Sequence, residues 1–200
     1  MTAADAKAKT KPRGKGKGLI LFHGAGGDRD HHTFLRLEQD LPIPVARINF
    51  PYRQKGPGRR PPDRMPKLIE AVNATVDHHA AQWRVRRTSI VVGGRSMGGR
   101  AASMAVAEGM KAAGLVLLSY PLHPPGKPEK LRVDHLNQIT VPTLLVQGLR
   151  DPFGTPDEFA EYLPLIPGSL SEHWINANHS PKESFDDEIV GFVGSWLKAL

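Results

Sequence analysis

The sequence predicts one doubly wound α/β domain, a mostly parallel sheet of about six strands with helices on both faces. Short apolar runs alternate along the chain with segments of helical periodicity. Several of these runs are apolar on consecutive residues, as expected of strands that are buried on both faces. The chain has 200 residues, no internal repeat and no second set of hydrophobic segments. Its length and pattern therefore favour a single domain with a full core.

Six runs rich in Val, Ile and Leu are predicted to be strands. The first leads into the glycine loop 23–27, and the second is stopped by Pro51. The third leads into a cluster of glycines around Ser96. In chain order, the predicted strands are 18–22, 45–50, 89–92, 114–120, 142–148 and 170–175.

Five segments between and after these strands are predicted to be helices. The longest carries Leu68, Val72 and Val76 at helical spacing, and the one after Ser96 is rich in alanine. The Pro-rich stretches 53–66 and 121–128 are predicted to be loops. In chain order, the predicted helices are 31–40, 67–83, 100–109, 158–163 and 189–200.

Most of the positive charge lies at the N-terminus. The formal net charge is +7, and residues 1–17 supply +5 of it through six Lys and Arg against Asp5. A tail of Gly, Lys and Ala cannot bury a core, so residues 1–17 are predicted to be disordered and residues 18–200 to form the domain. Within that domain, residues 18–100 sum to +7 and residues 101–200 to −5. This asymmetry indicates a polarised surface and no specific nucleic-acid site, with only weak, salt-sensitive binding through the tail left open.

The composition also narrows the chemistry and the compartment. The chain has no cysteine, which excludes disulfides and thiolate catalysis. No apolar stretch reaches the ~20 residues that cross a bilayer, and the N-terminus lacks the apolar core of a secretory signal. We therefore expect a cytoplasmic protein without a membrane partner. The sequence does not indicate its oligomeric state.

The most specific motif lies between residues 90 and 100. A β-branched run leads into Gly94-Arg95-Ser96-Met97-Gly98, which fits Gly-x-Ser-x-Gly. In this motif a buried strand ends in a strained turn that exposes a serine and begins a helix. Residues around the serine must lack side chains that would collide. Ser96 is therefore the predicted nucleophile. The alternative is that Ser96 has no catalytic role and is simply a residue that fits a tight turn.

Related motifs stand at the ends of other predicted strands, namely His23-Gly24-x-Gly26, Gly148-x-x-Asp151 and Asn178-His179-Ser180. With them the chain resembles an α/β-hydrolase over nearly all of residues 18–200, and in particular the compact dienelactone-hydrolase-like branch. It also resembles a small hydrolase-like family with bacterial members and animal relatives, one of them a subunit of a chromatin acetyltransferase complex. The resemblance implies the fold and a hydrolytic reaction. Compared with most members, we expect the chain to lack the first two antiparallel strands and any long insertion between the fourth and fifth strands, where a lid would lie.

His179 is the predicted general base, and Asp151 is predicted to orient it. The order Ser, Asp, His along the chain is the order that this fold uses. The competing interpretation of Asp151 is an Asx turn or a helix cap. Asp157, the nearest acidic competitor, is expected to cap the helix that begins at Glu158.

The other histidines are weaker candidates for the base. His173 falls inside the last predicted strand, where the pleat restricts its ring. The resemblance gives His23 a structural hydrogen bond and no proton transfer. Five further histidines are expected to be solvated at the surface because their contexts are polar or helical: His31, His32, His78, His79 and His135.

The backbone N–H groups of Ala25 and Met97 are the predicted oxyanion hole. Met97 follows the nucleophile at a helix N-terminus, whose dipole favours negative charge. Ala25 lies in a glycine loop that can approach a ligand closely. The alternative for this loop is a phosphate nest, but the chain has no Gly-x-Gly-x-x-Gly or Walker pattern.

Two further clusters could either bind a ligand or lie solvated at the surface. The run 28–32, Asp-Arg-Asp-His-His, contains metal-ligand types, but adjacent residues rarely converge on one ion, so no metal or other cofactor is expected. A predicted loop that borders the active face carries four arginines, either solvated or placed to attract an anionic acyl group or phosphate. They are Arg53, Arg59, Arg60 and Arg64.

These residues favour a serine hydrolase that cleaves a small-molecule ester or thioester through a Ser96–His179–Asp151 triad. The absence of a lid favours a shallow pocket and a short acyl group. The alternative is a non-catalytic binding or scaffold protein that keeps the hydrolase fold. The presence of all three triad residues and both oxyanion loops argues against that alternative.

Overall fold

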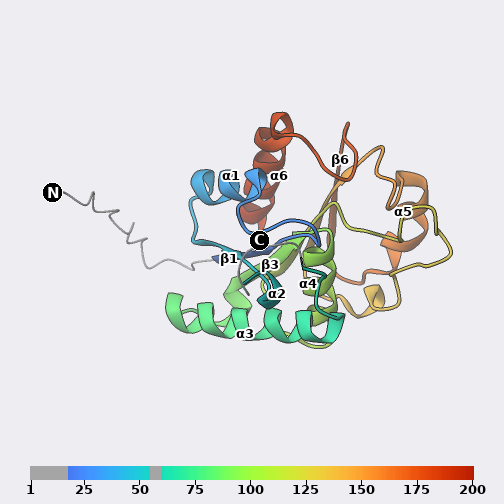
Figure 1. The fold of residues 1–200 in the computed structure, drawn as a ribbon. Coiled ribbons are helices and arrows are strands. Elements are labelled where there is room, and N and C mark those ends of the chain that lie inside the picture. Colours follow the sequence, from blue (N-terminus) through green and yellow to red (C-terminus); the bar gives the residue numbers. More distant parts are fainter. Residues whose placement is uncertain (1–17, 55–59) are drawn as a thin grey trace.

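The computed structural model describes residues 18–54 and 60–200. These residues form a central sheet with helices packed on both sides (Figure 1). All strand pairs are parallel, in the order β2-β1-β3-β4-β5-β6. The predicted fold class, a doubly wound parallel sheet, is confirmed. The strands are β1 (Gly18–Phe22), β2 (Val45–Ile48), β3 (Ile90–Arg95), β4 (Gly114–Leu118), β5 (Thr143–Gly148) and β6 (Leu170–Ile175).

Alternating residues of the strands supply a hydrophobic core on each face of the sheet. On β1, Leu19 and Leu21 belong to the core beneath α1 and α6, whereas Ile20 and Phe22 belong to the core beneath α3 and α4. Figure 1 shows α1 and α6 together on one side and α3 on the other. The helices are α1 (His32–Asp40), α2 (Pro51–Gln54), α3 (Met65–Trp83), α4 (Met97–Ala107), α5 (Pro156–Tyr162) and α6 (Asp186–Ala199).

Several element boundaries differ from the prediction, and each difference has a physical reason. β2 ends at Ile48, two residues early, because its partner β1 ends at Phe22. β4 ends at Leu118, since Ser119 has a φ of 49°, which no strand accommodates. β3 continues through its glycines to Arg95 because β1 and β4 flank it on both sides. The short helix α2 was not predicted.

The N-terminus of α5 differs from the prediction that Asp157 caps this helix. The helix begins at Pro156, and Thr155 is its N-cap, so Asp157 lies in the first turn and is not the cap. The Glu158 carboxylate accepts hydrogen bonds from the backbone N–H of Thr155 at 2.8 Å and from its hydroxyl at 2.9 Å. This arrangement is a capping box with proline at the first helical position.

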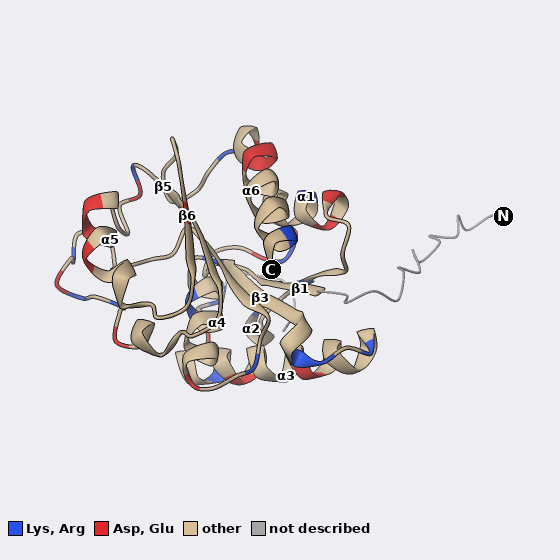
Figure 2. Cartoon of the chain, turned by 180° about the vertical axis from the view of Figure 1, so that it is seen from behind, with Lys and Arg blue, Asp and Glu red and all other residues tan. Residues whose placement is uncertain are grey.

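Acidic residues gather on α5 and in the first turn of α6 (Figure 2). Negative charge at a helix N-terminus interacts favourably with the helix dipole, which explains why α6 begins at Asp186, before the predicted residue 189. No helix in the described residues is long and apolar enough to cross a membrane. The predicted disordered tail, 1–17, lies outside the described residues and stays a prediction.

The parallel topology decides where a site can form. The carboxyl ends of parallel strands share one edge of the sheet, and ligands bind there in open α/β sheets. The loop after β1, the turn after β3, and the loops after β5 and β6 all leave from this edge. They carry Ala25, Ser96, Asp151 and His179, respectively.

Candidate active site

The turn between β3 and α4 holds Ser96 in an unusual backbone conformation. Its φ of 51° and ψ of −118° are rarely adopted by a residue with a side chain. The Ser96 N–H donates to the Leu118 carbonyl at 2.9 Å, and its carbonyl accepts from the N–H of Arg100 at 3.0 Å. The surrounding hydrogen bonds therefore maintain the strain, as is common at functional sites.

The two motif glycines are required because β1 ends against this turn. A Cβ atom at Gly94 or at Gly98 would collide with the backbone carbonyl of Phe22. This contact is rigid backbone on backbone, so neither position can accommodate a side chain without moving the strand. The predicted reason for the glycines, lack of room for side chains, holds in the structure.

The structure brings the side chains of Ser96, His179 and Asp151 into one hydrogen-bonded chain. His179 Nε2 lies 2.8 Å from Ser96 Oγ. His179 Nδ1 lies 2.8 and 3.0 Å from the two carboxylate oxygens of Asp151. Because a carboxylate only accepts hydrogen bonds, Nδ1 must carry the proton, which leaves Nε2 to accept from the serine hydroxyl.

The Asp151 side chain is fully buried, with 0% of its surface exposed, and two further donors satisfy it. Gln147 Nε2 donates to Oδ2 at 2.7 Å, and the backbone N–H of Phe153 donates to Oδ1 at 2.9 Å. The Phe153 ring also stacks on the His179 imidazole, with centroids 3.9 Å apart. These contacts fix the orientation of the carboxylate and of the ring that it holds.

The sequence analysis did not identify Gln147. One signal was present, because Gln147 is a polar residue in the otherwise apolar end of β5, where burial leaves it 0% exposed. A buried amide requires partners, and Asp151, four positions later, is the nearest acidic residue along the chain.

Arg95 was also missed as a part of the site. It lies between Gly94 and Ser96, and its Nη2 donates to the backbone carbonyl of His179 and to the hydroxyl of Ser180, both at 2.7 Å. Burial lowers the pKa of its guanidinium. Arg95 therefore connects the end of β3, next to Ser96, directly to the backbone of the loop that carries His179.

The two predicted oxyanion residues lie on either side of Ser96. Met97 is the first residue of α4, where a backbone N–H has no partner within the helix. The loop of Ala25 lies against the serine, since a Cβ at Gly24 would be 3.4 Å from Ser96 Cβ. The Tyr52 hydroxyl donates to the Ala25 carbonyl at 3.0 Å and so orients this peptide. The catalytic role of both amides stays a prediction.

His23 makes structural hydrogen bonds in the same loop. Its Nε2 accepts from the backbone N–H of Phe50 at 3.2 Å, while Nδ1 donates to the Gly24 carbonyl at 2.7 Å. This pattern fixes a neutral tautomer, and burial lowers the pKa of the ring. The ring thus holds the loop in place.

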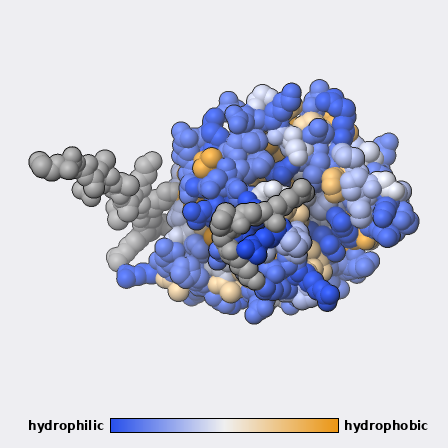
Figure 3. Space-filling view, viewed as in Figure 1, coloured by the Kyte–Doolittle hydropathy of each residue, from blue (hydrophilic) through white to orange (hydrophobic). Residues whose placement is uncertain are grey.

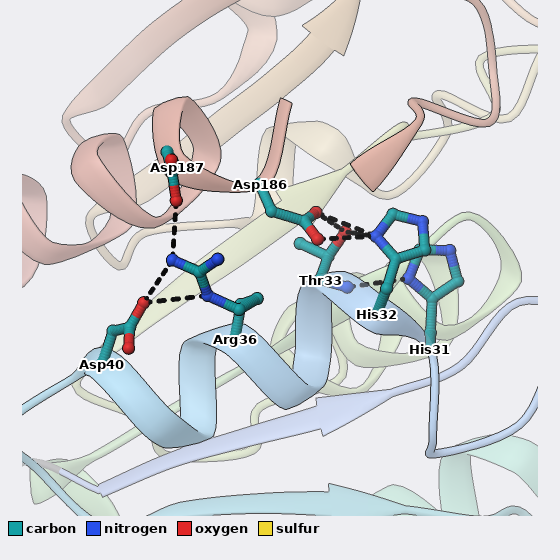
Figure 4. Close-up of polar contacts among 7 residues, drawn as sticks. All are labelled: His31, His32, Thr33, Arg36, Asp40, Asp186 and Asp187. Carbon is teal, nitrogen blue, oxygen red and sulfur yellow. Dashed lines mark hydrogen bonds and ion pairs between the residues drawn. The ribbon is translucent and has the colours of Figure 1, made fainter. Parts of the chain in front are cut away.

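For three other histidines the expectation of a solvated surface position was wrong. His32 Nδ1 pairs with the buried Asp186 at 2.7 Å, and the His31 ring lies against the ring of His32 (Figure 4). His135 Nε2 is 2.8 Å from the hydroxyl of the buried Ser103. Burial lowers the pKa of His31 and of His135 to about 4. The prediction failed because tertiary packing covers these polar segments.

His173 and His123 each contact a side chain of another element. His173 stacks on Phe192 with centroids 3.9 Å apart, in keeping with its place inside β6. His123, which the sequence analysis did not weigh, is buried and pairs with Glu158 at 3.1 Å.

No group of three metal-ligating side chains forms anywhere in the described part of the chain. In the run 28–32, Asp30 pairs with Arg47.

One hollow of the described surface adjoins a predicted site residue. The face in Figure 3 is mostly hydrophilic, and its apolar residues are scattered. A cavity of about 460 Å³ adjoins Ala25 and Gly26. A larger hollow of about 590 Å³ lies between α5 and β6, and none of the site residues lines it. Of these two hollows, the one beside Ala25 adjoins a predicted site residue.

The fold and the geometry of this edge define an α/β hydrolase. A model of the family described as alpha/beta hydrolase domain matches residues 15–188, and the chain belongs to this family. The compact, lidless branch noted from the sequence is consistent with this match.

Solved structures show the same fold at low sequence identity. The ferulic acid complex of Est1E from Butyrivibrio proteoclasticus has a TM-score of 0.78 at 18% identity, covering 96% of this chain and 91% of that one. An alpha-beta serine hydrolase homologue from Coxiella burnetii has a TM-score of 0.68 at 20% identity, covering 94% and 87%. The RedJ thioesterase of prodiginine biosynthesis in Streptomyces coelicolor has a TM-score of 0.64 at 18% identity, covering 90% and 85%.

Proposed function

We propose that this hydrolase is a serine esterase or thioesterase that works through an acyl-enzyme. The observation that carries the proposal is the chain of short contacts from Asp151 through His179 to the hydroxyl of Ser96. A serine hydroxyl is a weak nucleophile until a neighbouring base accepts its proton. The strained turn presents this hydroxyl at the edge where substrates of such sheets bind.

The reaction follows from the placement of the protons. Ser96 Oγ attacks the acyl carbon while His179 Nε2 takes the hydroxyl proton, and Asp151 stabilises the imidazolium that forms. The N–H groups of Ala25 and Met97 stabilise the negative oxygen of the tetrahedral intermediate, and each typically lowers the barrier by ~3 kcal/mol. The imidazolium then protonates the leaving alcohol or thiol. Water, activated by the same imidazole, releases the acid.

The substrate class is inferred from what surrounds the serine. Between β4 and β5 the described chain forms loops and one short 3₁₀ turn, η2 (Leu136–Gln138), with no helical lid. A site without a lid offers little apolar area to a long acyl chain. The similar structures include a complex with ferulic acid and a thioesterase, which supports ester and thioester substrates of modest size.

The test is turnover of short 4-nitrophenyl esters and acyl thioesters by wild type and by Ser96→Ala. We expect wild type to hydrolyse at least one of them, and Ser96→Ala to lose about three or more orders of magnitude in kcat. A matched control is Ser103→Ala, which removes a buried hydroxyl from α4 outside the site. Equal rates for wild type and Ser96→Ala, or a folded wild type inert toward the whole panel, would favour the non-catalytic scaffold instead.

A further inference from the structure

The cavity beside the Ala25 loop has a chemical character that ester hydrolysis alone does not explain. It measures about 460 Å³, and two arginines and two prolines of the described chain line it together with the loop. Its lining residues are Ala25, Gly26, Arg53, Arg60, Pro61 and Pro62. Arginine side chains on the wall of a cavity next to a nucleophile favour an anionic ligand.

The position of Arg53 relative to the loop is fixed on both sides. The residue before it, Tyr52, donates its hydroxyl hydrogen bond to Ala25, and burial raises the pKa of that hydroxyl to about 12. Arg53 itself pairs with Asp28 at the far end of the same loop. These contacts connect the short helix α2 to the loop 24–28 at two points, and Arg53 lines the same cavity as Ala25.

The hydrogen-bonding capacity of Arg53 is only partly used. Its Nε is buried and has no acceptor among the described residues. Its pair with Asp28 is 3.3 Å long, and 27% of the Arg53 side chain and 43% of the Asp28 side chain are exposed. Charge-assisted pairs normally measure about 2.7–2.9 Å. The buried Nε therefore lacks the acceptor that a polar atom withdrawn from water needs.

We propose that this cavity binds an anionic oxygen group, a carboxylate or a phosphate, that the acyl substrate carries. The inference rests on the proposed esterase function and adds the charge of its substrate. Ala25 belongs both to the cavity and to the predicted oxyanion hole. An anion held by Arg53 and a carbonyl carbon at Ser96 are therefore parts of one molecule, oriented at two points.

The test compares two esters that differ in this group alone. The 4-nitrophenyl half-ester of adipic acid ends in a carboxylate, and 4-nitrophenyl heptanoate replaces that carboxylate with an ethyl group. The quantity measured is the ratio of their kcat/KM values for each protein. We expect wild type to favour the half-ester, and Arg53→Met to lower the ratio about tenfold because one charge-assisted hydrogen-bonding group is lost. Added salt should lower the wild-type ratio as well.

The matched control is Arg150→Met. Arg150 is an exposed arginine at the same edge of the sheet, its side chain bonds to Asn176, and it lines no part of the cavity. Its substitution removes the same charge and is expected to change the ratio less than about twofold. Arg53→Lys covers the case in which Arg53→Met does not fold: it keeps the charge, and we expect an intermediate ratio.

A binding measurement separates the two anions and does not depend on turnover. Adipate and inorganic phosphate are added in turn to Ser96→Ala, with and without Arg53→Lys, and the melting temperature is recorded. The anion that the cavity binds should stabilise Ser96→Ala, and less so the double variant.

The outcomes distinguish this inference from the function on which it rests. If both esters are hydrolysed and the Arg53 variants leave the ratio unchanged, the anion site is wrong and the esterase stands. If neither ester nor any thioester is hydrolysed, the esterase is wrong. The melting data then decide the anion site alone: a shift that Arg53→Lys reduces supports it, and no shift with either anion overturns it.

Discussion

Two histidine–aspartate pairs in this molecule have almost the same geometry. In each, a nearly fully buried carboxylate faces the Nδ1 atom of a histidine: Asp151 is 0% exposed and Asp186 is 2% exposed. The distances from Nδ1 to the two oxygens are 2.8 and 3.0 Å for His179, and 2.7 and 2.9 Å for His32. By the pair alone, the two regions would be indistinguishable.

Their surroundings differ in what else the groups touch. His179 Nε2 faces Ser96 Oγ across 2.8 Å. At the other pair, the hydroxyl of Thr33 donates to Asp186 itself at 2.6 Å, and the His32 ring is covered by His31 (Figure 4). The Asp186 cluster joins α1 to α6 and holds no hydroxyl in front of the imidazole Nε2 in the described residues. The comparison teaches that the pair orients an imidazole, and that a strained serine in front of it is what points to catalysis.

The largest expected difference between the two regions is in turnover. Asp151→Asn should lower kcat/KM about 10⁴-fold, because an amide facing Nδ1 favours the tautomer in which Nε2 carries the proton and cannot accept it from Ser96. Asp186→Asn should change kcat/KM less than about threefold. Initial rates on the best ester, with circular dichroism as the control for folding, check both. Comparable losses in the two variants would erase the distinction.

Arg95 should have the next largest effect. Arg95→Met removes the two hydrogen bonds that hold the backbone at His179 and Ser180, so we expect kcat to fall about 10–100-fold while KM changes little. Arg36→Met is the control in the other region, where the side chain bonds to Asp40 and Asp187 (Figure 4). Steady-state kinetics on both variants check this. A change confined to KM or to melting temperature would give Arg95 a merely structural role.

The free energy of unfolding should depend on the Asp186 cluster, although turnover should not. Asp186→Ala leaves His32 and the Thr33 hydroxyl without their buried acceptor, so the free energy of unfolding should fall by about 1–3 kcal/mol. Thr33→Val should cost less, since the His32 pair remains. Urea denaturation monitored by circular dichroism provides both values. An Asp186→Ala protein as stable as wild type would show that the cluster does not hold α1 against α6.

The smallest expected effect is on the pH dependence of stability. Burial, with the charge of Arg95 as the second cause, lowers the pKa of His31 to about 4, below its usual 6.5. A folded-state pKa below the unfolded value means that the stabilisation is complete above pH 6.5 and is lost as the pH falls toward 4. His31→Asn keeps an acceptor for the Thr33 N–H and removes the titration. The free energy of unfolding, measured by thermal denaturation, should fall less in this variant than in wild type between pH 7 and 4. The difference should be less than about 1 kcal/mol because the ring is partly exposed. Parallel melting curves would contradict this origin of the pH dependence.

The sequence carries the fold and the predicted triad residues because both have local signatures. Consecutive apolar residues predicted the strands, and parallel pairing then determined that the loops of Ser96, Asp151 and His179 meet. The support around them has no such signature. Gln147 and Arg95 act on partners through tertiary contacts, and the pair of His32 with Asp186 joins residues 154 positions apart. The polar Gln147 in an apolar strand was a weak signal, but for Arg95 and for His32 no local pattern of the chain distinguishes these contacts from solvated side chains.

The errors at the strand ends also come from tertiary contacts, whereas the error at the start of α5 is local. Strand ends were set by the length of the neighbouring strand, as at Ile48, and not by the residues themselves. The cap at Thr155 was missed because the Asp157 side chain was weighed without its register to Pro156. A capping box is readable from sequence once Thr155 and Glu158 are considered together.

The most direct test of the central claim is covalent labelling of the intact protein with a fluorophosphonate, followed by mass spectrometry of its peptides. The account predicts one adduct, on Ser96, which forms far more slowly in His179→Ala and at the wild-type rate in His32→Ala. Labelling of Ser96→Ala at the wild-type rate, or an adduct on any other residue, would contradict it.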